Sequence, residues 1–329
     1  MSAAVPFTPN SRSPAESRVP SPESRNDGIT RVDLAELIAL RARAGKRGGA
    51  RTRTLLIGGH LSVLRGRGMD YAESRIYQPG DDARNIDWRR TARSGKWHTK
   101  LFQVEREHSL LVLIDTHATM RFGTRVRYKS VAAARAAAWL AWTCVRAGDR
   151  VGAMAFGSVR TAVDPSAGTR GALAVLGALL RWDEQAGTAA EGSSEPLSAA
   201  IERARRMAPH GSQAWLLSDG WCMDASATAA LARFARHVEL RVAIPVDPLE
   251  QGPAPPGAYL FETASGKYRV DLSTAPARVQ FRDRLAHGAR SLATACDNAS
   301  VPWTALATTD EPDATLAPLW RRRMRGPRT

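Results

Sequence analysis

The sequence predicts an α/β fold in which helices cover both faces of an open, mostly parallel sheet, with a smaller β-rich subdomain at the N-terminal side. The first observation is the continuous apolar run Leu110–Ile114, which has the length of one buried strand. A strand that is apolar on both faces usually belongs to a parallel sheet covered on both sides. The second observation is that strand-like runs alternate with helix-like segments from Ser109 onward. This alternation is typical of βαβ units.

Three segments precede this alternation. Residues 1–29 contain six serines and five prolines and few apolar residues, so we expect a disordered tail. Residues 30–54 place apolar side chains at helical spacing over Arg31–Arg43, followed by a Gly/Arg-rich linker. Residues 55–108 combine many glycines with aromatic and charged residues, which predicts short strands and turns.

Residues 109–310 are expected to form the α/β domain, and residues 311–329 a basic tail. The expected strands are Ser109–Ile114, Asp149–Phe156, an antiparallel Arg160–Asp164, Gln213–Ser218 and Leu240–Val246. The expected helices are Tyr128–Val145, Thr169–Leu180, Pro196–Met207, Ala225–Arg236 and Ala277–Asn298. Pro248–Gly257 reads as a linker before a hairpin of Tyr259–Thr263 and Tyr268–Asp271.

Composition narrows the class of protein. Hydrophobic residues make up 43% of the 329 residues, and no apolar run approaches the roughly 20 residues of a membrane helix. The N-terminus lacks the basic and apolar regions of a secretory signal. Three cysteines without a Cys-x-x-Cys pair predict neither a disulfide framework nor a zinc module. We therefore expect a cytoplasmic protein.

The net charge is +15, from 47 Lys+Arg and 32 Asp+Glu. Such a charge favours anionic partners, including acidic proteins, membrane headgroups and nucleic acid. Arginine and alanine dominate over lysine and isoleucine, which indicates a compositional origin for much of this charge. We therefore do not expect nucleic-acid binding, while the basic run from Arg321 to Arg325 leaves peripheral membrane contact open.

Polar side chains follow two of the predicted buried strands. Asp115, His117 and Thr119 occupy alternate positions after the first strand, and Asp219 follows Gln213–Ser218. The carboxyl edge of an open α/β sheet is where ligands bind. Carboxylate and hydroxyl oxygens suit a hard divalent cation, which predicts a site for Mg²⁺ or Mn²⁺.

Residues 109–120 resemble the first strand and metal-site loop of von Willebrand factor A domains, whose pattern is Asp-x-Ser-x-Ser. The resemblance implies that Asp219 is the distal aspartate of that site and that Ser194 replaces its threonine. Here His117 stands where the first serine is expected. Imidazole suits Zn²⁺, Ni²⁺ or Fe²⁺ better than Mg²⁺. Three alternatives stay open: Mg²⁺ or Mn²⁺, a softer metal through His117, or no metal.

A second motif lies between Arg75 and Arg93. Its pattern, Arg-x-Tyr-x-Pro-Gly-Asp-Asp-x-Arg-x-Ile-Asp-Trp followed by Ala-Arg, resembles the signature of the bacterial domain of unknown function 58 family. The resemblance extends over residues 35–310. It implies an adaptor or co-chaperone that works with a MoxR-type AAA+ ATPase in assembling other complexes. The matching positions are Arg75, Tyr77, Pro79, Gly80, Asp81, Asp82, Arg84, Ile86, Asp87, Trp88, Ala92 and Arg93.

Two interpretations of this motif stay open beside a weaker catalytic one. Carboxylates interleaved with arginines predict an internal ion-pair lattice. Tryptophans among arginines have the composition of an interface anchor, which predicts a docking surface. The residues concerned are Arg75, Tyr77, Asp81, Asp82, Arg84, Asp87, Trp88 and Arg93.

The predicted function is protein–protein interaction without catalysis, with the partner docking at the carboxyl edge around Asp115 and Asp219. The chain has no Gly-x-x-x-x-Gly-Lys-Ser/Thr motif, so it is not itself a P-loop ATPase. One alternative is a metal-dependent hydrolase that uses Asp115 and Asp219. A second alternative is a basic nucleic-acid-binding protein.

Overall fold

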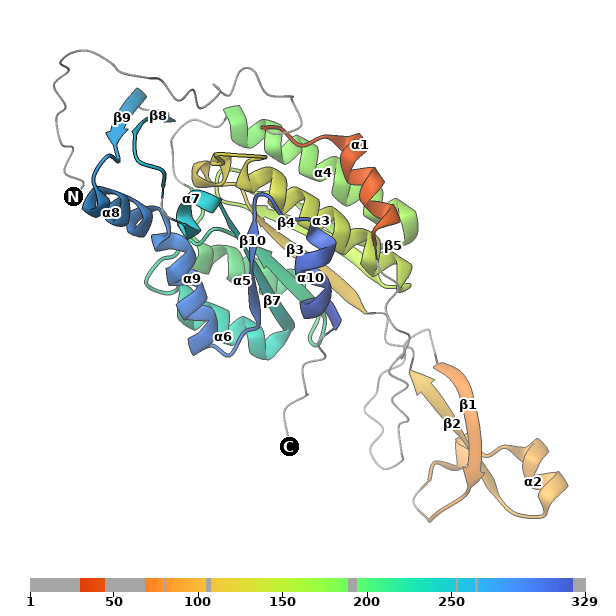
Figure 1. Ribbon diagram of the computed structural model, residues 1–329. Helices are drawn as coiled ribbons and strands as arrows, with labels where there is room; N and C mark the ends of the chain where they lie inside the picture. The colour runs from red at the N-terminus through yellow and green to blue at the C-terminus, as the bar shows by residue number, and fades with distance from the viewer. Residues whose placement is uncertain are drawn as a thin grey trace.

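The computed structural model describes residues 30–44, 69–79, 81–104, 108–188, 194–252, 254–263 and 266–321. Its centre is a six-stranded sheet in the order β10-β7-β6-β3-β4-β5 (Figure 1). Every neighbouring pair is parallel except β4 and β5. The predicted open, mostly parallel sheet is therefore confirmed. Its strands are β3 (Ser109–Asp115), β4 (Arg150–Phe156), β5 (Ala162–Ala167), β6 (Gln213–Leu217), β7 (Glu239–Val246) and β10 (Trp303–Ala307).

Strand β3 is buried on both faces, as its apolar run predicts. Leu110, Val112 and Ile114 contribute to one hydrophobic core, and Leu111 and Leu113 contribute to the other. Successive side chains of a strand point to opposite faces, so β3 divides two helical layers. The first layer contains α1 (Leu34–Ala39), α3 (Lys129–Arg146), α4 (Gly168–Thr188) and α10 (Pro312–Arg321). The second contains α5 (Leu197–Met207), α6 (Ala227–His237) and α9 (His287–Asn298).

Helix α3 is the central helix of the first layer and is almost entirely buried. Its many alanines leave room for neighbours on several sides, and its two tryptophans anchor the N-terminal segment. The indole nitrogens of Trp139 and Trp142 donate to the carbonyl oxygens of Arg43 (3.2 Å) and Leu37 (3.0 Å). Helix α1 and the 3-10 turn η2 (Leu40–Ala42) are thereby attached to α3. The helix expected over Arg31–Arg43 is present in this form, whereas residues 1–29 and 45–54 lie outside the described residues.

The predicted β-rich segment contains an antiparallel pair, β1 (Met69–Ile76) and β2 (His98–Val104), which forms a sheet of its own. Between these strands lie the 3-10 turn η3 (Ala83–Asn85) and helix α2 (Trp88–Ser94), which the sequence analysis did not predict. Asp87 caps the start of α2 and Gly95 ends it in the left-handed conformation, φ 69°. We call residues 69–104 the β1–β2 unit.

Three expectations for the C-terminal third are corrected. The expected linker contains a short helix, α7 (Pro248–Gln251), which begins with a capping box. The single helix expected over Ala277–Asn298 is two helices, α8 (Ala275–Leu285) and α9, separated at Ala286. The break allows Gly288 of α9 to pack on the loop after β6, where a Cβ atom at Gly288 would lie 2.7 Å from Trp221 Cδ1. The expected hairpin is present as β8 (Ala258–Thr263) and β9 (Gly266–Asp271).

The third correction concerns the segment expected to be a basic tail. Residues 312–321 form α10, whose Leu316 is fully buried, and β10 adds a parallel strand beside β7. The ring of Trp320 lies between those of Trp139 and Trp215, with centroid distances of 6.3 and 6.5 Å. The α/β domain therefore continues past residue 310. Among the described helices, none is both long and apolar enough to span a membrane.

Candidate functional site

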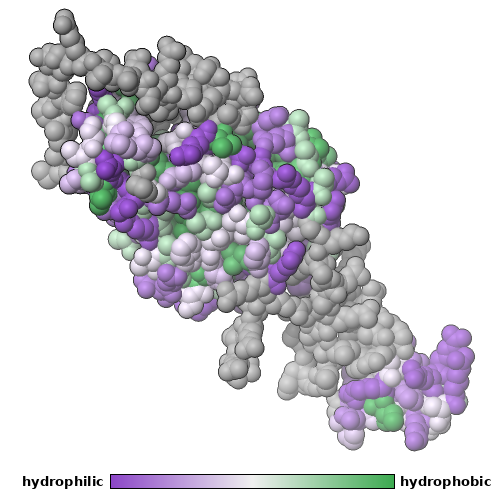
Figure 2. Space-filling view, viewed as in Figure 1, coloured by the Kyte–Doolittle hydropathy of each residue, from purple (hydrophilic) through white to green (hydrophobic). Residues whose placement is uncertain are grey.

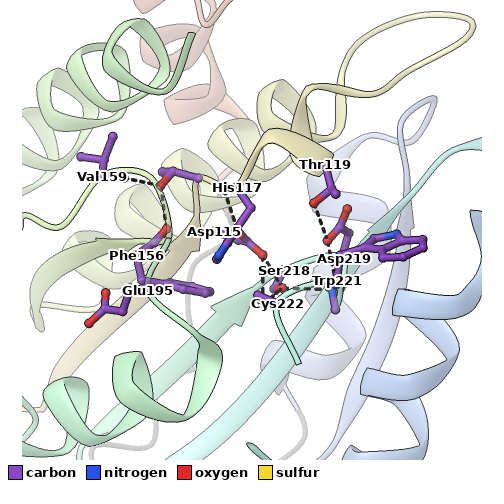
Figure 3. Close-up of polar contacts among 12 residues, drawn as sticks. Asp115, His117, Thr119, Phe156, Val159, Glu195, Ser218, Asp219, Trp221 and Cys222 are labelled. Atoms are coloured by element: carbon purple, nitrogen blue, oxygen red, sulfur yellow. Dashed lines mark hydrogen bonds and ion pairs between the residues drawn. The ribbon is translucent and has the colours of Figure 1, made fainter. Parts of the chain in front are cut away.

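The carboxyl ends of β3 and β6 meet at one edge of the sheet because the two strands are parallel neighbours with Ile114 opposite Leu217. Asp115 is the last residue of β3, and Asp219 follows β6 by two residues. The loop after β3 carries His117 and Thr119. Figure 3 shows these four side chains converging, with Thr119 pointing to Asp219 and His117 against Asp115. The structure thus brings four of the five predicted metal ligands together.

Asp115 is 1% exposed and has hydrogen-bond partners on both carboxylate oxygens. Its Oδ1 accepts from the backbone nitrogen of His117 (2.8 Å) and from His117 Nδ1 (2.6 Å). Its Oδ2 accepts from Ser218 Oγ (2.6 Å) and from Cys222 Sγ (3.4 Å). Burial lowers the pKa of His117, but the carboxylate of Asp115 more than offsets this, so the pKa is raised overall.

Asp219 is also 1% exposed and fully engaged. Its Oδ1 accepts from Thr119 Oγ1 (3.3 Å) and from the backbone nitrogen of Trp221 (3.1 Å), and its Oδ2 accepts from Lys129 Nζ (3.2 Å). Burial raises the pKa of the Asp219 carboxyl, and the ammonium of Lys129 opposes that rise.

Lys129 is the residue that the sequence analysis missed. It is the first residue of α3, and its Nζ lies 2.5 Å from Glu250 Oε1 as well as 3.2 Å from Asp219 Oδ2. Helical side chains tilt toward the helix N-terminus, so a residue in this position reaches back to the sheet edge. Burial lowers the pKa of Lys129, but the carboxylates of Asp219 and Glu250 raise it overall. The signal that could have identified Lys129 is a lysine, rare in this sequence, opening the helix after the strand-end loop.

This donor set does not fit a six-coordinate hard cation. Mg²⁺ needs oxygen ligands at about 2.0–2.1 Å in near-octahedral geometry. All four carboxylate oxygens of Asp115 and Asp219 are already engaged by protein donors, and the ammonium of Lys129 lies against Asp219. Ser194, the fifth predicted ligand, is exposed and so stays outside this buried cluster.

A softer metal would meet a different obstacle. One ligand atom each from Asp115, His117 and Cys222 lies within 4.8 Å of the others. Thiolate, not thiol, is the metal-binding form of cysteine. Burial strongly raises the pKa of the Cys222 thiol, so this ligand stays protonated unless a metal displaces the proton.

An open groove is lined in part by Trp221, which is two residues after Asp219 in the chain. Its volume is about 1190 Å³, and its lining includes Trp221, Val279 and His287. Trp221 is 43% exposed and its ring contacts that of His287, with centroids 5.8 Å apart. The buried carboxylates therefore sit below a surface on which an aromatic side chain is accessible.

In the β1–β2 unit the acidic residues mostly support local backbone. Asp81 pairs with Arg75 at 2.6 Å, and Asp82 accepts from the backbone nitrogen of Arg84. Asp87 caps α2 through the Arg90 nitrogen and accepts from Ser74 Oγ at 2.6 Å. One of these contacts is an Arg–carboxylate pair, two are capping contacts, and the fourth is a hydrogen bond between the side chains of Ser74 and Asp87.

The two tryptophans of this unit are exposed instead. Trp88 and Trp97 are 65% and 56% exposed, and their rings contact each other with centroids 6.2 Å apart. Tyr77 contacts Trp97 at 6.0 Å. Arg84 and Arg93, the remaining predicted residues, are exposed. We call Tyr77, Trp88 and Trp97 the aromatic cluster.

The cap at Asp87 predicts a pH-dependent stability of the β1–β2 unit. The hydrogen bond from Ser74 and those from the α2 backbone lower the pKa of Asp87. A lowered carboxyl pKa stabilises the fold above the unfolded value, and this contribution disappears as the pH falls through the folded value. We expect Asp87→Asn to weaken amide-exchange protection over residues 69–104 at pH 7, and the difference from wild type to shrink below about pH 4.

Asp164→Asn, in β5, is the control for this comparison because it lies outside the unit. It should leave the protection of residues 69–104 unchanged at every pH. Asparagine can still cap α2, so a wild-type-like protection of this unit in Asp87→Asn at pH 7 would show that the charge of Asp87 does not stabilise it.

Comparison with known proteins gives one family and several similar chains. The sequence model of the family described as "Protein of unknown function DUF58" matches residues 73–293. Uncharacterized protein Rv1480 of Mycobacterium tuberculosis and uncharacterized protein Mb1516 of Mycobacterium bovis are each 30% identical over 241 residues, covering 71% of this chain and 72% of theirs.

Two solved structures are also similar. The conserved hypothetical protein BatB from Bacteroides thetaiotaomicron is 13% identical with a TM-score of 0.35, covering 59% of this chain and 98% of its own. A von Willebrand factor type A protein from Catenulispora acidiphila is 15% identical with a TM-score of 0.32, covering 57% and 44% respectively.

Proposed function

This chain belongs to the family described as protein of unknown function DUF58, and on that premise we propose that it is a non-catalytic interaction protein. Its proposed partner is an AAA+ ATPase of the MoxR type, with which it acts as an adaptor or co-chaperone in assembling another complex. The proposed compartment is the cytoplasm, where the three buried cysteines, none of them in a disulfide, stay reduced.

The observation that carries this proposal is the exposed aromatic cluster with its basic surroundings. Trp88 and Trp97 present large amphipathic rings, and the exposed Arg89, Arg90 and Arg93 flank Trp88 on α2. Tryptophan and arginine are the residues most enriched at the energetic centres of interfaces. Figure 2 shows one face of the molecule, on which hydrophobic residues are scattered among hydrophilic ones. We therefore place the main contact at the aromatic cluster and expect an acidic partner surface.

The structure changes the role predicted for the carboxyl edge of the sheet. Asp115 and Asp219 are each 1% exposed, so neither carboxylate is available to a partner, contrary to the docking predicted from the sequence. The reason is that their oxygens are used by neighbouring donors of the same chain. Trp221, exposed above them, is the residue through which this edge would make a secondary contact.

The test is direct binding between the purified protein and a purified MoxR-type ATPase. We expect Trp88→Ala combined with Trp97→Ala to weaken binding by at least about tenfold, because a buried interface tryptophan is worth roughly 2 kcal/mol or more. Binding should also slow as salt rises, since rim charges mainly control the association rate. Leu173→Ala is the matched control, because Leu173 is an exposed apolar residue of α4, outside the β1–β2 unit.

The other outcomes either contradict the proposal or favour an alternative. Equal binding by the double variant and the wild type would remove the aromatic cluster from the interface, and no binding at all would overturn the proposal. A salt-sensitive complex with nucleic acid in place of the ATPase would favour the nucleic-acid-binding alternative. Metal-dependent turnover that is lost in Asp115→Ala would favour the hydrolase.

A further inference from the structure

Buried carboxyl groups gather at the carboxyl edge of the sheet, among them those of Asp115, Asp219 and Glu250. Asp115 ends β3, Asp219 follows β6 and Glu250 belongs to α7, and all three are at most 5% exposed. Buried carboxylates require a compensating cation or a network of donors. Asp115 has such donors in His117 and Ser218. Asp219 and Glu250 instead share one basic group.

That group is Lys129, whose side chain is 3% exposed. Its ammonium lies 2.5 Å from Glu250 Oε1 and 3.2 Å from Asp219 Oδ2, and 5.5 Å from the centroid of the Phe122 ring. One nitrogen therefore bridges carboxylates from two elements that are 31 positions apart in the chain. We propose that the ammonium of Lys129 takes the place of a divalent cation, so that this edge is closed by a cation from the chain itself and takes up no metal.

The chemistry of the side chain supports this assignment. An ammonium is a compact point charge with three rotatable donors, whereas a guanidinium is a planar fork. A point charge suits a position between two carboxylates from different elements. The sequence contains only five lysines among its 47 basic residues, and one of them occupies this buried position. The same sequence uses arginine at almost all its other basic positions.

The ammonium and a metal ion would compete for the same oxygens. A divalent cation bound to Asp219 would lie within a few ångströms of Lys129 Nζ, which already contacts Oδ2. Two positive charges this close repel each other strongly where the surroundings are dry. Removing the ammonium should therefore open a divalent-cation site between Asp219 and Glu250, with Thr119 Oγ1 as a further oxygen ligand.

The experiment compares the wild type with Lys129→Ser, which removes the charge and leaves space for a hydrated ion. The probes are Mg²⁺ and Mn²⁺ at about 10 mM against a chelator, followed by thermal melting and by direct titration of Mn²⁺. We expect no change in the melting temperature of the wild type when metal is added. We expect Lys129→Ser to bind one Mn²⁺ and to melt roughly 5 °C higher when the metal is about 100-fold above its Kd.

Two matched variants make the result specific. Lys129→Met removes the same charge but fills the space, so it should gain no metal response. Asp219→Asn added to Lys129→Ser removes a proposed ligand, so it should abolish the Mn²⁺ binding of the single variant.

Two outcomes would overturn the proposal. The first is a wild-type protein that binds one Mn²⁺ and loses it in Asp219→Asn. The second is a folded Lys129→Ser variant that binds no Mn²⁺ at these concentrations. If Lys129→Ser does not fold in chelator, refolding with and without Mn²⁺ decides the question, because recovery only with metal supports the proposal and failure with metal overturns it.

Discussion

Gly220→Ala should destabilise the protein by about 4 kcal/mol, through backbone strain and a steric clash together. Gly220 has φ 80°, a left-handed conformation that costs roughly 1–2 kcal/mol for a residue with a Cβ atom. A Cβ atom there would lie 2.2 Å from the carbonyl oxygen of Gly288, a backbone atom of α9 that cannot rotate away. Relief of the clash requires α9 to move off the loop that carries Asp219. Denaturant unfolding monitored by circular dichroism measures the loss.

Gly148→Ala is the control, because it separates the two contributions. Gly148 has φ 84°, but a Cβ atom at that position would have no neighbour within 4 Å. Gly148→Ala should therefore lower the free energy of unfolding only by the backbone strain, about 1–2 kcal/mol. Equal losses in the two variants would show that α9 does not press on the loop after β6.

Asp219→Ala should cost about 3–5 kcal/mol, the usual loss when one partner of a buried ion pair is removed. The change deprives Lys129 of one of its two carboxylates and leaves Thr119 Oγ1 and the Trp221 nitrogen without their acceptor. Asp219→Asn keeps the shape and an acceptor oxygen, so it should recover part of the loss. Chemical denaturation of the three proteins measures these differences.

Asp224→Ala is the matched comparison, since Asp224 lies in the same loop. Its carboxylate accepts from the backbone nitrogens of Ser198 and Ser226, so its removal should cost about 1 kcal/mol, as for a helix cap. A loss for Asp219→Ala no larger than that for Asp224→Ala would mean that the Lys129 contact contributes little to stability.

The elements that sequence analysis predicted well are those whose pattern is local and strong. The apolar run of β3 and the alanine-rich α3 need no distant information to be recognised. Strand β10 was missed because it is a five-residue strand with threonine and alanines, and α10 because Pro312 and Pro318 discourage a helical interpretation. Both depend on tertiary burial, which the local pattern does not carry.

The same distinction applies to the site. Asp115 and Asp219 could be placed at one edge because parallel strands end on the same side. The contact between Lys129 and Glu250 could not be predicted, because Glu250 lies in a segment that was interpreted as a linker. One local signal was available: Asp247-Pro248-Leu249-Glu250 has the spacing of a capping box, in which Glu250 also accepts from the Asp247 nitrogen.

The attachment of α1 to α3 bears on where the cooperative folding unit ends. The family match begins at residue 73 and stops at residue 293, yet Leu37, Leu306 and Leu316 are buried in the same hydrophobic core as α3. Arg135 of α3 even forms ion pairs with Glu36 and Glu311, which lie outside the match on opposite sides. The segment that the family model matches is thus smaller than the physical domain. The two flanking segments pack on the same helix, α3, and both must be present for its tryptophans to be covered.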